Sequence, residues 1–199
     1  EAKAEDKNPL TAKEQARKDA EAITSFLGEV FQSPDPTREG HSFTVAEMLD
    51  NAAKKLDTDL AAQPAQRAKL QATLADTYYT LGLASQAIPL QEKVRDYHLA
   101  TSGPEHPDTL TAMGNLANSY YAAGRLDEAF KLREEVLTLR RKVLGPEHPD
   151  TLLAMGRLAT SYHAAGRRDE ALKLREEVLA LRRKVLVPED RYTLSAMNN

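Results

Sequence analysis

The chain contains two nearly identical copies of one 42-residue sequence, and the second follows the first without a gap. Residues 103–144 and residues 145–186 differ at only seven positions. A fixed period of this length is typical of stacked supersecondary units, each of which contacts only its neighbours, and not of a single globular core. The period therefore predicts a repeat array.

The differences between the copies are concentrated on one helical face. Four of the seven lie at 111/153, 115/157, 118/160 and 121/163, at spacings of 4, 3 and 3 residues. On an α-helix these positions occupy one arc of roughly 120°. Most of the residues that differ between the two copies are thus predicted to lie on one side of the first helix of each unit.

Each unit is predicted to be a pair of antiparallel helices. Pro107 and Asp108 favour a helix start, and Gly124 favours a left-handed C-terminal cap. A second helix is expected to open at Asp127 and to end before Gly145. Because neither pair could bury its apolar face alone, the expected fold class is all-α, a solenoid of antiparallel helix pairs.

The repeat extends beyond the two clear copies in a weaker form. The predicted segments are a disordered tail (1–8), an N-terminal cap of two helices with a loop at about 33–43 (9–60), a degenerate repeat (61–102), the two copies (103–144 and 145–186) and the truncated start of a further repeat (187–199). Thr44 and Glu47 fit a capping box at the start of the second cap helix. Because the last repeat is incomplete, we expect the chain to be a fragment.

Composition excludes several classes of function. The net charge is −3, so nothing favours a nucleic-acid surface, and the chain has no cysteine for disulfides or thiolate metal sites. No apolar run is long enough for a membrane span, and no catalytic motif occurs. We therefore expect no enzyme activity, no cofactor and no metal. His106 and His148 recur with the period and are interpreted as linker residues with structural hydrogen bonds.

The pattern of small and large residues now identifies a family. Leu116-Ala117 with Tyr120, then Gly124 and Ala129, resembles the tetratricopeptide repeat across residues 61–199. The 42-residue period and the Gly-Pro-Glu-His-Pro-Asp-Thr linker look like the longer variant of kinesin light chains and many bacterial proteins. This resemblance implies a right-handed superhelical solenoid whose concave groove binds an extended peptide of a partner protein.

The same resemblance places the variable positions, together with their equivalents one period earlier, in that groove. We call this set the groove stripe: Lys69, Thr73, Asp76, Tyr79, Thr111, Asn115, Asn118, Tyr121, Leu153, Arg157, Thr160 and His163. Asn side chains can hydrogen-bond both backbone groups of a peptide, and Tyr offers a rigid face with a polar tip. The alternative is that these are exposed positions that drifted after a duplication.

The charged runs of the second helices are predicted to be solvated faces. Residues 131–135 and 173–177 mix both signs, and the Asp127–Lys131 spacing favours an ion pair within the helix. The second copy carries a small excess of positive charge while the first is balanced, which indicates at most a slight preference for acidic partners.

Two further hypotheses remain open. A second, weaker resemblance rests on the order of Phe26-Leu27, Pro34, the stretch from Thr44 to Asp50, and Gln63-Pro64, ahead of Leu81-Gly82-Leu83. This order is similar to the region that follows the kinase domain and transmembrane helix of bacterial serine/threonine protein kinases, although no kinase motif is present. On that reading the segment would be a non-catalytic, extracytoplasmic regulatory region, whereas a free-standing repeat protein would be cytoplasmic. The other hypothesis is self-association through exposed solenoid ends. No nucleic-acid or direct membrane contact is expected under any of these hypotheses.

Overall fold

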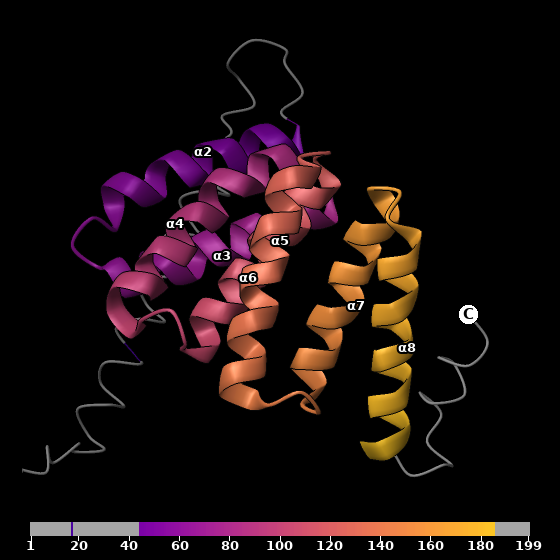
Figure 1. Cartoon of the computed structure of the whole chain (residues 1–199). Coiled ribbons are helices and arrows are strands. Elements are labelled where there is room, and N and C mark those ends of the chain that lie inside the picture. Colours follow the sequence, from indigo (N-terminus) through magenta and orange to yellow (C-terminus); the bar gives the residue numbers. More distant parts are fainter. Residues whose placement is uncertain (1–16, 18–43, 186–199) are drawn as a thin grey trace, which may run out of the picture. The chain divides into compact units, whose positions relative to one another are not determined.

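The computed structural model describes residue 17 and residues 44–185, and the longer of these stretches consists of helices joined by short turns (Figure 1). Its seven helices are α2 (Val45–Asp59), α3 (Pro64–Thr80), α4 (Ala84–Ser102), α5 (Pro107–Ala122), α6 (Leu126–Leu144), α7 (Pro149–Ala164) and α8 (Arg168–Val185). No strand occurs within these residues, so the predicted all-α class is confirmed. The predicted first cap helix and the start of a further repeat at 187–199 lie outside the described residues.

The chain divides into two compact units, Glu1–Leu74 and Ala75–Asn199. In the first unit, α2 packs against the beginning of α3 through Leu56, Leu60 and Leu70, which are all buried. The predicted capping box is confirmed at the start of α2. The backbone N–H of Glu47 donates to Thr44 Oγ1, and the Glu47 carboxylate accepts from the backbone N–H of Thr44 at 2.8 Å.

In the second unit each helix from α4 to α8 packs against the next one along the chain (Figure 1). One core cluster joins Ile88 of α4 to Leu116 and Tyr120 of α5 and to Ala129 of α6. A second cluster joins α5 to α8 through side chains that recur with the period: Met113, Val136, Leu137, Leu152, Met155, Leu158 and Leu174. The residues shared by the copies therefore form the core.

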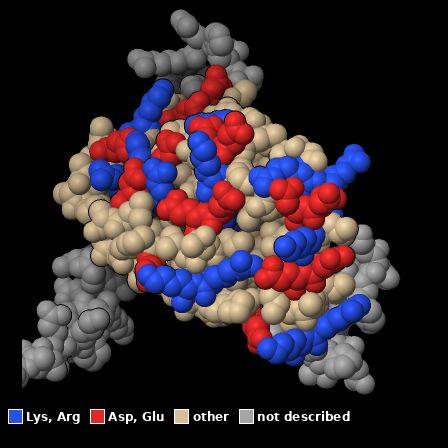
Figure 2. Space-filling model, in the orientation of Figure 1, with Lys and Arg blue, Asp and Glu red and all other residues tan. Residues whose placement is uncertain are grey.

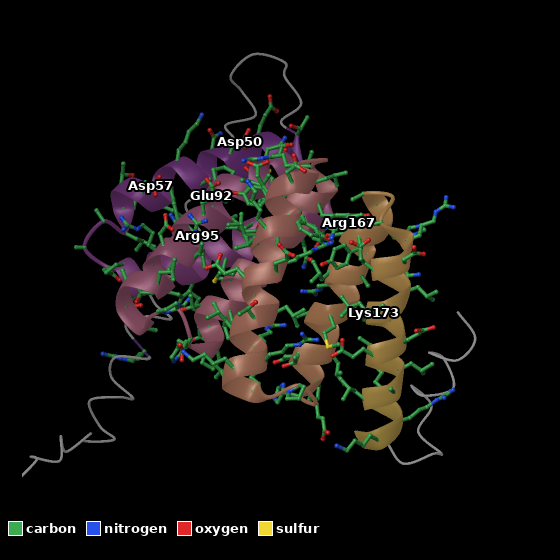
Figure 3. All side chains as sticks on the ribbon, viewed as in Figure 1. Asp50, Asp57, Glu92, Arg95, Arg167 and Lys173 are labelled. Carbon is green, nitrogen blue, oxygen red and sulfur yellow. The ribbon has the colours of Figure 1, made fainter. Side chains whose placement is uncertain are left out.

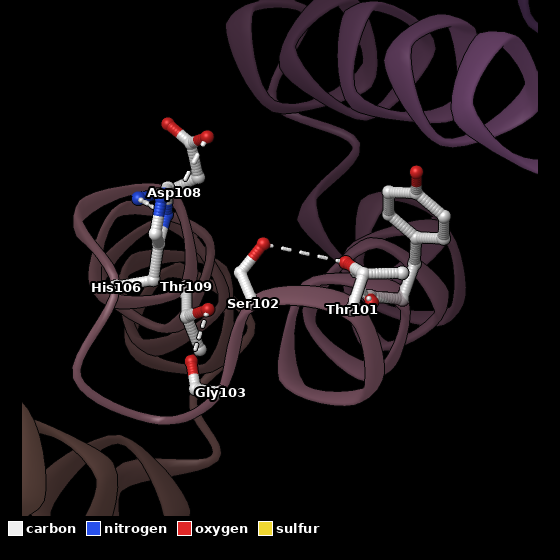
Figure 4. A network of polar contacts seen from close by, with 7 residues as sticks. Thr101, Ser102, Gly103, His106, Asp108 and Thr109 are labelled. Carbon is white, nitrogen blue, oxygen red and sulfur yellow. Dashed lines mark hydrogen bonds and ion pairs between the residues drawn. The ribbon is translucent and has the colours of Figure 1, made fainter. Parts of the chain in front are cut away.

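The linker between α4 and α5 is fixed by local hydrogen bonds (Figure 4). His106 is the N-cap of α5, and its Nδ1 accepts from the backbone N–H of Asp108 at 3.2 Å. The buried hydroxyl of Thr109 donates to the carbonyl of Gly103 at 2.7 Å. His148 caps α7 in the same way, so the structural interpretation of both histidines is confirmed.

The turn between α5 and α6 depends on a glycine. Gly124 has φ +77°, a left-handed conformation that costs a residue with a Cβ atom about 1–2 kcal/mol. This conformation lets the backbone N–H of Arg125 reach back to the carbonyl of Tyr120 at 2.8 Å. The predicted C-terminal cap is thus confirmed, and the tight turn allows α6 to pack antiparallel to α5.

Candidate functional site

The groove stripe differs in exposure along its length. Lys69 and Thr73 are exposed on the part of α3 that belongs to the first unit. The exposed members in the second unit are Asp76, Tyr79, Thr111, Leu153, Thr160 and His163. Asn115, Asn118, Tyr121 and Arg157 are half-buried. Partial burial also raises the pKa of the Asp76 carboxyl above its usual value. The half-buried members lie where α5 and α7 approach one another across α6.

Arg133 of α6 is the residue that brings these stripe members together. Its Nη1 donates to the carbonyl of Arg157 at 2.9 Å and to Ser161 Oγ at 2.7 Å, both on α7. Its Nη2 donates to Asn118 Oδ1 on α5 at 3.4 Å. The guanidinium carbon lies 4.5 Å from the centre of the Tyr121 ring, a cation–π distance. Arg133 therefore joins the stripe residues of both copies.

Two further guanidiniums lie close to Arg133. A Cβ atom built on Gly114 would stand 3.7 Å from Arg157 Nη1 and 3.9 Å from Arg140 Nη2, so both groups rest against the bare backbone of α5. Arg140 Nη1 also donates to the carbonyl of Asp150 at 2.9 Å. We call Arg133, Arg140 and Arg157 the arginine cluster. Together with Gly114 and Ala154, they line one small cavity between α5, α6 and α7.

Arg133 is an exception to the prediction that residues 131–135 form a solvated face, whereas Lys131, Glu134 and Glu135 are exposed as predicted. Arg133 is 7% exposed and Arg140 is 6% exposed. Burial lowers the pKa of Arg133 and of Arg140, and the neighbouring charge of Arg157 lowers both further. Sequence reasoning missed these residues because the local sequence of α6 does not show which neighbouring helices cover its arginines.

A larger cavity of about 320 Å³ lies beside the arginine cluster. Its walls include Tyr121, Leu126 and Phe130, which are three of the seven positions that differ between the copies. Arg167, at the turn between α7 and α8, also lines this cavity; it is labelled in Figure 3. Its guanidinium carbon lies 5.4 Å from the centre of the Phe130 ring. The second copy has His163, Arg168 and Leu172 at the corresponding positions, so the apolar lining belongs to the first copy.

Several of the exposed charges outside the cluster are paired. On the face seen in Figure 2, acidic and basic side chains alternate and do not form a single field. Arg125 pairs with Glu128 on α6, and Arg141 with Glu177 of α8 at 2.8 Å. The expected Asp127–Lys131 ion pair does not form in the described structure; the pair found at this end of α6 is Arg125–Glu128.

Sites of other kinds are absent from the part of the chain that the structure describes. No group of three His, Asp or Glu side chains between residues 44 and 185 could hold a metal ion. None of the described helices is long and apolar enough to cross a membrane.

Comparison with known protein families gives one match. The tetratricopeptide repeat model matches residues 66–129 and again residues 110–184, which together cover more than half of the chain. No curated protein sequence matches the chain significantly.

Solved structures agree with this match. A Podosopora anserina protein classed as a kinesin light chain, with nearly identical TPR-like repeats, is 35% identical over 65% of this chain, with a TM-score of 0.59. The chain spans 62% of the length of that protein. BtubC from P. vanneervenii shares the fold at a TM-score of 0.60 and 16% identity, over 94% of this chain and 80% of its own. Neither the family match nor these structures support a link to a kinase. The sequential packing of the helix pairs, the recurring core and the family match together show that the chain belongs to the tetratricopeptide repeat family.

Proposed function

We propose that the chain binds an extended segment of a partner protein along the groove stripe of α5 and α7. Tetratricopeptide repeat domains are generally protein-interaction modules, and the family is typically non-catalytic. The proposal adds to this general role a location on the chain and a mode of binding. A preformed groove lowers the ordering cost of association, and a peptide backbone supplies regularly spaced hydrogen-bonding groups.

The proposal rests on where two sets of residues lie: those shared by the copies and those that differ between them. Shared residues such as Leu116 and Met155 form the core, whereas the side chains of Asn118 and Tyr121 contact the guanidinium of the buried Arg133. The same guanidinium donates to the backbone carbonyl of Arg157. Asn115 lies one turn before Asn118 on the same face, and its amide has no hydrogen-bond partner among the described residues. That amide can therefore donate to and accept from a peptide backbone.

The neighbouring cavity supports the same mode of binding. A volume of about 320 Å³ is enough to hold one large side chain of a bound segment. Tyr121 belongs both to the stripe and to the wall of this cavity, so a segment lying on the stripe passes its mouth. The stripe would supply backbone contacts, and the cavity would select one apolar side chain.

The proposal is tested with peptides selected from a random 12-residue library on the purified chain. We expect the double variant Asn115→Ala, Asn118→Ala to weaken binding of the selected peptides about fivefold or more by calorimetric titration, since each lost amide contact contributes roughly 0.5–1.5 kcal/mol. Thr138→Ala is the matched control, because Thr138 also differs between the copies but bonds only within α6, to the carbonyl of Glu134. Equal affinity of the double variant and the wild-type chain would refute the proposal.

Self-association remains a separate prediction. Leu172 on α8 is 57% exposed, and a second copy that packed against α8 would cover it. Light scattering over a concentration series, with Leu172→Glu as the variant, tests it. A constant molar mass of the wild-type chain at all concentrations would exclude this contact.

A further inference from the structure

The place that Arg133 fills on α6 has an equivalent on α4, one period earlier. Gln91 occupies it and is as deeply buried, with 5% of its surface exposed against 7% for Arg133. Its side chain is shorter than that of arginine and carries an uncharged amide in place of the guanidinium. The junction of α3, α4 and α5 therefore has no guanidinium at the place where the following junction has one.

The groups that hold the Arg133 guanidinium also have equivalents one period earlier. They are Asn118 Oδ1, Ser161 Oγ, the carbonyl of Arg157 and the ring of Tyr121. The equivalent residues are Asp76, Ser119, Asn115 and Tyr79, all within the compact unit Ala75–Asn199. We call these four residues and Gln91 the Asp76 site. The set matches the surroundings of the Arg133 guanidinium in its chemical groups, except that a carboxylate replaces the Asn118 amide.

Two buried oxygen atoms of the Asp76 site have no hydrogen-bond partner. They are Oε1 of Gln91 and Oγ of Ser119, and the side chains that carry them are both more than nine-tenths buried. One period later the equivalent hydroxyl, Ser161 Oγ, accepts from Arg133 Nη1 at 2.7 Å. A buried polar atom without a partner is costly, so a hydrogen-bond donor from outside the chain would be stabilised at this place.

The carboxylate of Asp76 also lacks a cation. Among the described residues, no Lys or Arg nitrogen lies within ion-pair distance of it, whereas Glu128 and Glu177 both have arginine partners. Partial burial raises the pKa of Asp76, which is the change expected for a carboxyl group that no cation stabilises. Asp76 is exposed and Tyr79 is 43% exposed, so a ligand can approach both from solvent.

The composition of the Asp76 site favours a guanidinium over an ammonium. A guanidinium is planar, so it can donate to a carboxylate with two N–H groups and lie against an aromatic ring at the same time. An ammonium is a compact point charge with three diverging donors. Arg133 is close enough to Tyr79 for their charges to interact, and the negative charge of Asp76 would offset the repulsion between Arg133 and a second cation.

We propose that the Asp76 site binds the guanidinium of an arginine side chain in the partner segment. The proposal rests on the proposed function for the source of the arginine, but not for the existence of the cation site. The Asp76 carboxylate would accept from the guanidinium, the Tyr79 ring would lie against it, and the oxygens of Gln91 and Ser119 would gain a donor. One arginine would thus be fixed at the α3 end of the stripe.

The cation site is tested first without any peptide. We expect about 20 mM N-acetylarginine amide to raise the unfolding midpoint of the wild-type chain by about 2 °C over sodium chloride of equal ionic strength, which corresponds to a dissociation constant of about 5 mM. Gln91→Arg supplies a guanidinium from within the chain, as Arg133 does one period later, and should abolish this rise. Asp76→Asn removes the carboxylate and should also abolish it.

Glu176→Gln is the matched control, because it removes one exposed carboxylate on α8 with the same change in charge as Asp76→Asn. It should respond to N-acetylarginine amide like the wild-type chain. An equal rise in all four proteins, or a rise in none, would overturn the cation site. A rise of the same size with N-acetyllysine amide would overturn the assignment to a guanidinium.

Peptides selected on the wild-type chain then test the source of the guanidinium. We expect an arginine at one fixed position. Its replacement by citrulline, which keeps the shape and removes the charge, should weaken binding to the wild type about tenfold and leave binding to Asp76→Asn unchanged. Selected peptides that tolerate this replacement would overturn the inference and leave the proposed function intact. A response to N-acetylarginine amide without any selected peptide would support the cation site and count against the proposed function.

Discussion

Tyr120 offers the sharpest test of how the repeats hold together. Its side chain is 8% exposed and packs against Ile88, Leu116 and Ala129, which come from three successive helices. Its hydroxyl donates to the Glu92 carboxylate of α4 at 2.6 Å; Glu92 is labelled in Figure 3. One residue therefore links a degenerate repeat to the first clear copy by an apolar ring and by a charge-assisted hydrogen bond.

Two substitutions separate these contributions. Tyr120→Phe keeps the ring and removes the hydroxyl, which should lower the free energy of unfolding by about 1.5–3 kcal/mol because the acceptor is charged. Tyr120→Ala also removes the buried ring, and the expected loss is about 3–5 kcal/mol. Tyr162→Phe is the matched control one period later, because its hydroxyl has no hydrogen-bond partner in the described part of the chain. Urea unfolding followed by circular dichroism measures all three changes.

The pH dependence of these differences gives an independent check. Burial, followed by the hydrogen bond and the negative charge of Glu92, raises the pKa of Tyr120 to about 12, above its usual value of about 10. The folded state thus favours the protonated phenol. This preference contributes about 2–3 kcal/mol to the free energy of unfolding. The contribution is fully present below pH 10 and is lost as the pH rises through 12.

The wild-type chain and Tyr120→Phe should therefore converge in stability between pH 10 and pH 12. Other groups that titrate in this range are common to both proteins and cancel in the difference. A stability difference that does not change with pH, or a Tyr120→Phe variant as stable as the wild type at pH 7, would refute the role assigned to the hydrogen bond with Glu92.

Three further predictions concern single positions. Arg133→Ala should lower the free energy of unfolding, measured in urea, by about 1–3 kcal/mol, because it leaves acceptors on α7 unpaired. Arg175→Ala should change it by less than about 0.5 kcal/mol, and equal effects of the two substitutions would contradict the difference in burial. His106→Ala removes the N-cap and should lower the free energy of unfolding by about 1 kcal/mol, and with it the thermal midpoint, whereas His106→Asn should restore both; failure of Asn to rescue would argue against capping. Gly124→Ala should lower the free energy of unfolding by about 1–2 kcal/mol because of the left-handed backbone at this position, although no atom lies within 4 Å of the new Cβ; a neutral result would show that the turn relaxes.

Sequence alone determined the repeat unit and the limits of its helices. Pro107 at a first turn, Gly124 at a left-handed cap and Gly145 after the second helix act through their own backbone preferences, so their effect can be read locally. Shared apolar positions such as Leu116 and Met155 are buried because side chains on the inner face of a stacked helix pair are covered by its neighbours. The same reading placed the groove stripe on one face of α5 and α7.

The arginine cluster, by contrast, was decided by tertiary structure. Residues 131–137 and 173–179 have the same sequence, yet Arg133 is buried and Arg175 is exposed. Helix propensity and charge pattern cannot distinguish them, because burial depends on what packs against a helix and not on the helix itself. Arg133 is covered by α5 and α7, which carry Asn118 and Ser161 as its partners. The shared sequence thus forms the centre of a candidate binding site at Arg133 because α7, the first helix of the following unit, packs against it.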